Sequence, residues 1–372
     1  TYIRAFDTGS LLVTRGSKLM ADGSASSPIT FSSAVDQNYD GYGEWGGVII
    51  QGFAPQYGAG GTGACYGSGT VCNIEGEGGT EISVYGGNEP ADNSGVIRYV
   101  RIAEGGLVAG PNNEINGLTL QGVGHETVVE YVQVHNNLDD GIEWFGGTVN
   151  ARYIVLTNNY DDDIDFDEGY MGNIQYALVQ KDPNKAEPTG SNDPRGIEAN
   201  SSDDEYVPET AATLANITIV GSSVNNSDTH TKGRQPGMRL RGAVKVDIYN
   251  SMVQAFDTGC IRIDDADTNG DGTNNAFSQV KLENVIGDCA DGLYDKRDAD
   301  NATNTQETTI TFSSAYAINE SVALLPSTTA INAVNNGSGF VFDQTDYIGA
   351  VEPGTAEDNA WWAGWTIEGS LD

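Results

Sequence analysis

The stretch from Val129 to Gln180 decides the fold, because the same pattern recurs in it. The first copy reads Tyr131-Val-Gln-Val134, Asn136-Asn137, Asp139-Asp140 and Ile142-Glu-Trp144. The second copy repeats each of these groups at one constant offset and reads Tyr153-Ile-Val-Leu156, Asn158-Asn159, Asp161-Asp162 and Ile164-Asp-Phe166. A third copy begins at Tyr176-Ala-Leu-Val179, after a step one position longer. Units of this length, with short alternating strands and no helical period, are typical of stacked coils. The sequence therefore predicts an all-β fold, a right-handed parallel β-helix (solenoid) with long loop insertions.

The composition fits this turn-rich fold. The 372 residues include 48 glycines and 11 prolines, and Gly supplies the backbone angles that tight corners need. A solenoid extends by adding coils to one continuous core, so we expect a single domain over residues 1–372. Further strands are expected at 10–14, 16–23, 28–32, 48–51, 96–102, 115–120, 214–220, 244–249, 280–286 and 308–312, with a loop-rich insertion region at 34–95 and a projecting loop at 181–209.

The end of the chain is rich in aromatic residues. Three of the five tryptophans are Trp361, Trp362 and Trp365. Gly364 and Gly369 disfavour a helix there. We expect residues 340–372 to form an aromatic C-terminal cap packed over the last coil. The alternative is an exposed platform that stacks against sugars.

The charge balance limits the partners. The chain has 53 acidic and 18 basic residues and a formal net charge of −35. Such a surface repels the phosphate backbone of nucleic acids and attracts cations, although acidity that only keeps the protein soluble is the alternative. No apolar run reaches the length of about 18 residues that a membrane span needs, so we expect neither nucleic acid nor a membrane as partner.

The first coil has no cover in the sequence. Thr1 follows no leader sequence and reads as the start of a mature or truncated product. An uncovered coil exposes unpaired backbone groups that favour association. Either upstream coils have been removed or another molecule covers this end. An N-terminus lost to proteolysis or missing from this sequence is the alternative. We therefore expect the partners to be the protein itself, in end-to-end assembly, or a surface polysaccharide.

The four cysteines form two closely spaced pairs. Cys65 and Cys72 lie close together in a Gly-rich loop, and Cys260 and Cys289 are separated by somewhat more than one repeat. Both spacings suit local disulfides, the second between neighbouring coils. Disulfides indicate an oxidising, extracellular setting. Buried free thiols are the alternative.

Carboxylates recur at the repeat period. Coils lie about 4.8 Å apart in a β-helix, so residues one period apart become neighbours. The sequence predicts three stacked pairs, which are Asp139 with Asp161, Asp140 with Asp162, and Glu143 with Asp165. Strand alternation should bury Ile164 and Phe166 under Ile142 and Trp144, and turn outward Asp163, Asp165 and Asp167.

These pairs need a compensating charge. Two unit charges at this spacing repel by roughly 1 kcal/mol in water and about 3–4 kcal/mol at an effective dielectric of about 20. Ca²⁺ takes several oxygen ligands in a flexible geometry and suits clustered carboxylates better than Mg²⁺. We therefore predict a Ca²⁺ site formed by Asp139, Asp140, Glu143, Asp161, Asp162, Asp163 and Asp165. Carboxylates that are solvated or paired with Lys and Arg are the alternative.

Two further segments have the spacing of calcium loops. The first offers Asp265, Asp267, Asn269 and Asp271, and its twelfth position is Ala276 rather than the Glu of an EF-hand. The second offers Asp36, Asn38, Asp40 and Glu44. Turns stabilised by Asp and Asn side chains without a metal are the alternative for both.

Signals for catalysis are weaker. Parallel β-helices include polysaccharide lyases and hydrolases, which use a base or paired carboxylates. The candidates are the acids Asp161, Asp162, Asp163 and Asp165 and the bases Arg234, Arg239 and Arg241. The Asp139-Asp-Gly141 triplet also suits a β-helix corner for turn reasons alone. Since only fold analogy supports catalysis, we assign no catalytic residue.

Several segments resemble a group of secreted or outer-membrane-anchored bacterial β-helix proteins, largely uncharacterised. They are Asn112–Leu120, Glu130–Val134, Asp139–Asn150, Asp161–Asp163, Asp346–Ala350 and Trp361–Thr366. The resemblance extends from Leu11 to Thr366, and the segments 36–44 and 65–72 look like additions. It implies a β-helix exported from a Gram-negative cell, and it transfers no catalytic residue.

The first functional hypothesis is an extracellular, calcium-stabilised β-helix with a structural, adhesive or filament-forming role at the cell surface. The alternatives are a Ca²⁺-dependent polysaccharide lyase or glycoside hydrolase, and a non-catalytic glycan-binding module. The repeats, the carboxylate pairs and the uncovered first coil favour the first.

Overall fold

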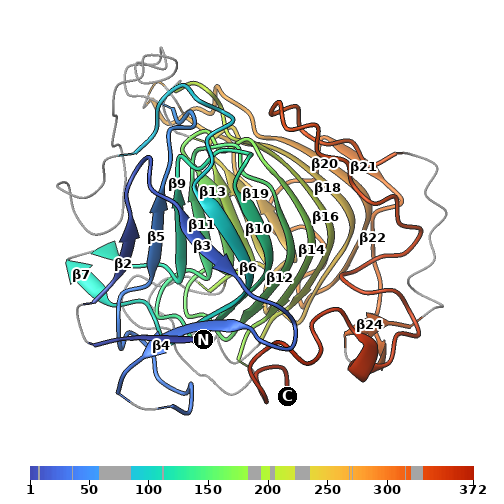
Figure 1. The fold of residues 1–372 in the computed structure, drawn as a ribbon. Coiled ribbons are helices and arrows are strands. Elements are labelled where there is room, and N and C mark those ends of the chain that lie inside the picture. The colour runs from blue at the N-terminus through green and yellow to red at the C-terminus, as the bar shows by residue number, and fades with distance from the viewer. Residues whose placement is uncertain are drawn as a thin grey trace.

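The computed structural model shows a solenoid of stacked coils (Figure 1). It describes residues 1–6, 9–35, 37–57, 85–110, 113–182, 194–201, 206–222, 235–267, 269, 271–314, 316–319 and 330–372. Within these ranges the secondary structure is β-strand apart from one 3₁₀ turn, η2 (Glu357–Asn359). The predicted all-β parallel β-helix is confirmed.

Two sheets make up the coils. In the described residues, sheet A contains β1 (Tyr2–Ala5), β3 (Leu19–Asp22), β4 (Ile29–Ser33), β6 (Gly95–Ala103), β10 (Val128–His135), β12 (Ala151–Thr157), β14 (Asn173–Gln180), β16 (Ala211–Val220), β18 (Lys245–Gln254), β20 (Gln279–Asp288), β21 (Asn301–Thr303) and β22 (Gln306–Glu307). Sheet B contains β2 (Leu11–Val13), β5 (Val48–Gln51), β9 (Leu118–Gln121), β11 (Ile142–Phe145), β13 (Ile164–Asp167), β15 (Ile197–Asn200), β17 (Met238–Arg241) and β19 (Ile261–Ile263). Two small antiparallel pairs lie outside them, β7 (Val108–Gly110) with β8 (Asn113–Glu114) and β23 (Phe312–Ser314) with β24 (Ala317–Ile318).

Residues that are one sequence repeat apart pair with each other in neighbouring coils. Strands β11 and β13 run parallel, with Ile142 opposite Ile164 and Trp144 opposite Phe166. These side chains belong to one buried apolar cluster that extends from Val13 to Leu293. The inward row of every sheet B strand thus supports the coil next to it, and the outward row is left for other chemistry.

A tyrosine ladder marks the bend in the strands of sheet A. It consists of Tyr99, Tyr131, Tyr153 and Tyr176, all with positive φ between 49° and 62°. Their rings stack at centroid distances of 4.4, 4.4 and 5.0 Å. The register continues the position as Asn216, Asn250, Asn284 and Asn304, also at positive φ. Asn adopts this conformation readily, whereas the tyrosines offset its cost through ring stacking.

The C-terminal segment 330–372 covers this ladder. Trp365 packs edge-on against Tyr99 and Tyr131, and Trp361 against Tyr153. Trp362 and Trp365 are buried in a cluster with Val155 of β12 and Leu178 of β14. The predicted cap over the last coil is therefore wrong, and the two buried tryptophans form no exposed platform. The rings pack instead on the outer face of sheet A, where the stacked tyrosines, Val155 and Leu178 offer apolar surface to bury.

Two other predictions need correction. The projecting loop at 181–209 contains β15, whose Ile197 pairs with Ile164 of β13 and is buried. This short strand follows a polar, proline-containing segment, so its apolar signal is weak. The expected strand at 308–312 is wrong except for its last residue, because β22 ends at Glu307 and β23 begins at Phe312. Residues 58–84, 183–193 and 202–205 lie outside the described residues.

Candidate functional site

One row of side chains crosses the outer face of sheet B from acid to base. The register aligns Glu143 of β11 with Asp165 of β13, and Asp165 with Glu198 of β15. It then aligns Glu198 with Arg239 of β17, and Arg239 with Arg262 of β19. We call these five residues the charged row. Three carboxylates in adjacent coils are thus followed by two guanidinium groups in the next two.

A group of aspartates lies at the acidic end of the charged row. Carboxylate oxygens of Asp139, Asp140 and Asp161 lie within 4.8 Å of one another, as do those of Asp140, Asp162 and Asp165. Asp140 Oδ1 also accepts a hydrogen bond of 2.8 Å from the backbone N–H of Asp162. The sequence correctly predicts that the acids of the two coils meet. We call these five residues the aspartate cluster.

The tight corner depends on Gly141. A Cβ atom at this position would lie 2.7 Å from the carbonyl oxygen of Asp163, closer than side chains tolerate. The Asp-Asp-Gly corner therefore has a packing role, independent of any function of its carboxylates.

Burial and mutual repulsion set the electrostatics of the aspartate cluster. Burial, together with Asp165, Asp139, Asp161 and Asp162, raises the pKa of Asp140 well above its usual value. Two carboxylates this close favour the neutral form of one of them unless a cation is present. The donor set is made of carboxylate oxygens alone, which are the ligands of hard cations. The residues present therefore fit Ca²⁺.

Arg195 joins the aspartate cluster to the charged row. It is buried and donates from Nη1 to Asp162 Oδ2 and to Glu198 Oε2, both at 3.0 Å. Its backbone N–H donates to Asp162 Oδ1 at 2.9 Å. Burial would raise the pKa of Glu198, but Arg195 and Arg241 outweigh this and lower the pKa to about 2. Sequence reasoning missed Arg195 because it lies in the segment taken for a projecting loop.

Asp163 does not belong to the aspartate cluster. It was expected to point outward, but it is fully buried, accepts a hydrogen bond of 2.8 Å from Asn159 and lies 2.7 Å from Nζ of the buried Lys181. Burial raises the pKa of Asp163, and Lys181 opposes this. The alternative of pairing with basic residues therefore holds for Asp163, and in part for Asp162. Asp167, expected to point outward as well, is also buried.

The basic end of the charged row stays partly exposed. Arg239 donates to Asp264 at 3.1 Å and lies 3.6 Å from Glu198. Arg241 donates to Glu198 at 2.7 Å, and Arg262 to Asp264 at 2.9 Å. The three arginine side chains remain 29, 34 and 35% exposed. Arg234, the third basic candidate, lies outside the described residues.

In the first predicted calcium loop, which contains Asp265, Asp267, Asn269 and Asp271, the aspartates bond to other groups of the protein and do not cluster. Asp265 bonds to Arg297 at 2.8 Å and to the N–H of Ser278 at 3.0 Å. Asp267 accepts from the backbone of Asp271 and Gly272, and Asn269 lies on the turn between them. No group of three carboxylates forms in either predicted loop among the described residues. A calcium role for these loops stays a prediction.

The second loop is described only in part. Asp36 lies outside the described residues, whereas Asn38, Asp40 and Glu44 are inside them. Glu44 Oε2 is shielded and finds no hydrogen-bond partner in the described part of the chain. Its neighbour Tyr42 donates to Asn136 at 2.7 Å, which fastens the loop to the coil that carries the aspartate cluster.

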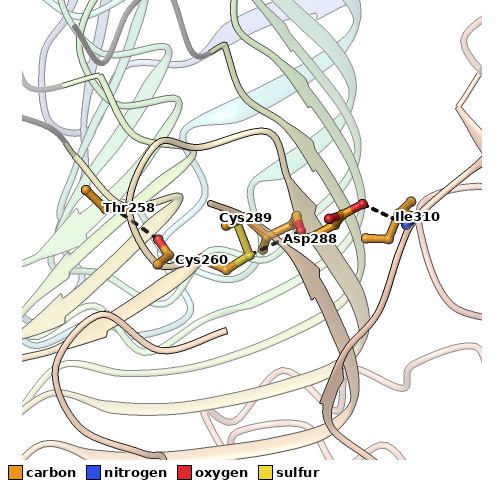
Figure 2. The surroundings of a disulfide bond; sticks show 7 residues. Thr258, Cys260, Asp288, Cys289 and Ile310 are labelled. Carbon is orange, nitrogen blue, oxygen red and sulfur yellow. Dashed lines mark hydrogen bonds between the residues drawn. A yellow bond between two sulfur atoms is a disulfide. The ribbon is translucent and has the colours of Figure 1, made fainter. Parts of the chain in front are cut away.

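A disulfide lies beyond the basic end of the charged row. Cys260 and Cys289 are bonded, with their Cα atoms 5.4 Å apart (Figure 2). Cys260 directly precedes β19 and Cys289 directly follows β20, so the bond joins successive parts of the last coils. The predicted bridge between these two cysteines is confirmed. Cys65 and Cys72 lie outside the described residues.

Comparisons with known proteins identify the family of this chain but not its activity. No curated protein matches the sequence. Among solved structures the chain is similar to the A-module of the mannuronan C-5 epimerase AlgE6 of Azotobacter vinelandii, at 12% identity and a TM-score of 0.23, over 83% of this chain and 90% of that one. A likeness this weak says nothing about what the chain does.

The described residues contain no helix long and apolar enough to cross a membrane. The Cys260–Cys289 bond fits a secreted protein. The model of the pectate-lyase-like β-helix domain matches residues 2–366, nearly the whole chain. This protein therefore belongs to the family of pectate-lyase-like β-helix domains.

Proposed function

We propose that this protein is an exported β-helix that binds an acidic polysaccharide along the outer face of sheet B, with Ca²⁺ held by the aspartate cluster. The observation that carries the proposal is the register, which puts the cluster at one end of the charged row and partly exposed arginines at the other. A polymer with regularly spaced carboxylates has a binding partner at both ends of such a row.

The cation end would be formed by Asp139, Asp140, Asp161, Asp162 and Asp165. Ca²⁺ bound there would supply positive charge, both to hold two coils together and to attract a uronate carboxylate. Arg195 keeps its own bonds to Asp162 and Glu198, so it orients the carboxylates without neutralising all of them.

The arginine end is the local exception in a chain of net charge −35. Guanidinium groups recognise carboxylates with two parallel hydrogen bonds. Arg239 and Arg262 lie in adjacent coils, about 4.8 Å apart along the solenoid. This arrangement suits a chain of acidic sugars lying across the strands.

Binding without cleavage is the better-supported reading. A lyase needs a base that gives up its proton, yet Arg241 is held as a cation. Burial lowers its pKa, but Glu198 outweighs burial and raises the pKa above the usual value. Lyase or hydrolase chemistry remains the second candidate, favoured by the family to which the chain belongs.

The location and biological role extend this proposal. A binding protein for acidic polysaccharide with a disulfide belongs outside the cell, and we place it in the extracellular space or at the surface of a Gram-negative bacterium. There it would act as a structural or adhesive element. End-to-end assembly into filaments remains a prediction.

The test is calorimetric titration with polygalacturonate and alginate, using neutral dextran as control, in Ca²⁺ and in EDTA. We expect binding of the acidic polymers only, weakened by EDTA. Arg239→Gln and Arg262→Gln should each weaken it about tenfold. Lys245→Gln, which removes an exposed cation of sheet A paired with Glu209, is the matched control. Binding that is absent, or equal for all variants, would refute the proposal, and release of unsaturated sugar ends would favour the lyase.

A further inference from the structure

A cleft lies on sheet A, where the C-terminal segment crosses the first residues of β10 and β12. It has a volume of about 400 Å³ and is lined by residues that are all described, which are His125, residues 127–130, residues 150–152, Ser338, Phe340 and Val341. This size lies within the range of about 300–1,000 Å³ usual for small-molecule sites. No residue of the charged row or of the aspartate cluster lines it.

One wall of the cleft is apolar. The guanidinium of Arg152 lies 4.4 Å from the centre of the Phe340 ring, which holds both side chains in place. Phe340 also packs edge-on against Phe342 at 4.9 Å. Next to it, Val341 is 72% exposed. Together, the partly buried Phe340 and the exposed Val341 offer an apolar surface at the cleft.

Two charged residues that line the cleft, Glu130 and Arg152, already have partners. Glu130 accepts a hydrogen bond of 3.1 Å from Arg98, and Arg152 lies 3.9 Å from Asp343. Glu130 and Arg152 are also opposite each other in the register of β10 and β12. Glu130 and Arg152 carry opposite charges, so the charges of these two lining residues cancel. Their remaining hydrogen-bonding capacity suits neutral hydroxyl groups.

Two polar atoms at the cleft have no partner among the described residues. They are Nδ1 of His125 and Nε of Arg152, both shielded from solvent. A shielded polar atom without a partner is unfavourable.

We propose that this cleft binds one neutral sugar residue of a glycan. The apolar face of the sugar ring would lie on Phe340 and Val341, and its hydroxyls would bond to Glu130 and Arg152. The site is independent of the proposed function, because it lies on the other sheet, uses no cation and takes a ligand without charge.

The test is titration of the full chain with a panel of neutral gluco-, manno-, galacto- and xylo-oligosaccharides, followed by NMR and calorimetry. We expect at least one series to bind. Glu130→Gln and Phe340→Ala should each raise its Kd about tenfold. Phe277→Ala, which removes another exposed aromatic ring outside the cleft, is the control and should leave the Kd unchanged. Glu130→Gln alters one exposed group and keeps the proposal testable if Phe340→Ala does not fold.

Two outcomes would overturn the inference. One is that no neutral oligosaccharide binds at millimolar concentration. The other is that the Kd depends on EDTA or on Arg239→Gln but not on Glu130→Gln, since binding would then belong to sheet B. Failure of acidic polysaccharides to bind would leave this cleft unaffected, so the two proposals can fail separately.

Discussion

Nη1 of Arg195 donates a hydrogen bond of 3.0 Å to Oδ2 of Asp162, and the two side chains are only 1% and 3% exposed. The same nitrogen lies 3.0 Å from Glu198 Oε2. One buried cation thus serves two carboxylates from neighbouring coils. The spacing of the coils brings the acids together, and Arg195 limits the repulsion that follows.

Replacing Arg195 with Met should be strongly destabilising. The change leaves Asp162 and Glu198 buried without their shared cation, and removing one partner of a buried pair costs about 3–5 kcal/mol. Urea unfolding followed by circular dichroism measures the loss. Lys245→Gln is the control, because its pair with Glu209 is exposed and should be worth under about 1 kcal/mol. Equal losses for the two variants would contradict the assigned role of Arg195.

The contribution of Asp140 to the stability of the metal-free protein should fall as the pH rises. The pKa of Asp140 is raised in the folded state, so its contribution is fully present below the unfolded pKa of about 4. That contribution is lost as the pH rises through the folded pKa. Asp140→Asn should therefore raise the thermal midpoint in EDTA at neutral pH, and Asn Oδ1 can still accept from the N–H of Asp162.

The Asp140→Asn variant also tests whether the aspartate cluster binds Ca²⁺. Ca²⁺ should stabilise the native protein through mass action, and it should stabilise Asp140→Asn less, because a ligand is missing. Asp22→Asn, on an exposed pair with Arg98, is the control and should change neither response. A thermal midpoint that Ca²⁺ leaves unchanged in the native protein would refute the cation site.

Loss of the Cys260–Cys289 bond should lower stability by about 3–4 kcal/mol, the loop-closure value for a loop of this size. The measurement is urea unfolding of the double variant Cys260→Ser/Cys289→Ser beside the native protein. Reduction of the native protein should produce the same loss, and the reductant should not affect the double variant further at these positions. If the variant unfolds at the urea concentration of the native protein, the bond does not stabilise the fold.

The tyrosine ladder should distinguish a backbone effect from a stacking effect. Tyr131→Ala and Tyr131→Asn both remove two ring stacks and the contact with Trp365, at a cost of about 2–4 kcal/mol. Asn adopts the positive φ of 55° more readily, so Tyr131→Asn should be the more stable by about 1 kcal/mol. Equal stabilities would show that the conformation contributes nothing, and Tyr2→Ala at an exposed ring is the control.

The sequence predicted the aspartate cluster because its members share one coil period. Asp139 and Asp140 are each separated from their partners by the same single repeat, and in a parallel stack that offset becomes direct contact. Of the charged row, only the pairing of Glu143 with Asp165 was predicted, and the register confirms it. The steps from Asp165 to Glu198 and from Glu198 to Arg239 are both longer than the repeat and differ from each other. Because the loops between these coils differ in length, paired residues are no longer separated by a constant number of positions in the sequence. Each strand nevertheless pairs in register with the strand before it.

The amino-acid order alone determined the coil, the inward apolar rows and the meeting of the acids, because these follow from local alternation and a short repeat. Only the tertiary structure decided that Arg195 and Lys181 are buried partners of those acids and that the tryptophans lie on the side of sheet A. The physical reason is the distance along the chain between the residues that determine each feature. A strand pattern is fixed by neighbours in the chain, whereas a buried ion pair or a segment folded back over a sheet is selected by the surface left free once the coils have stacked.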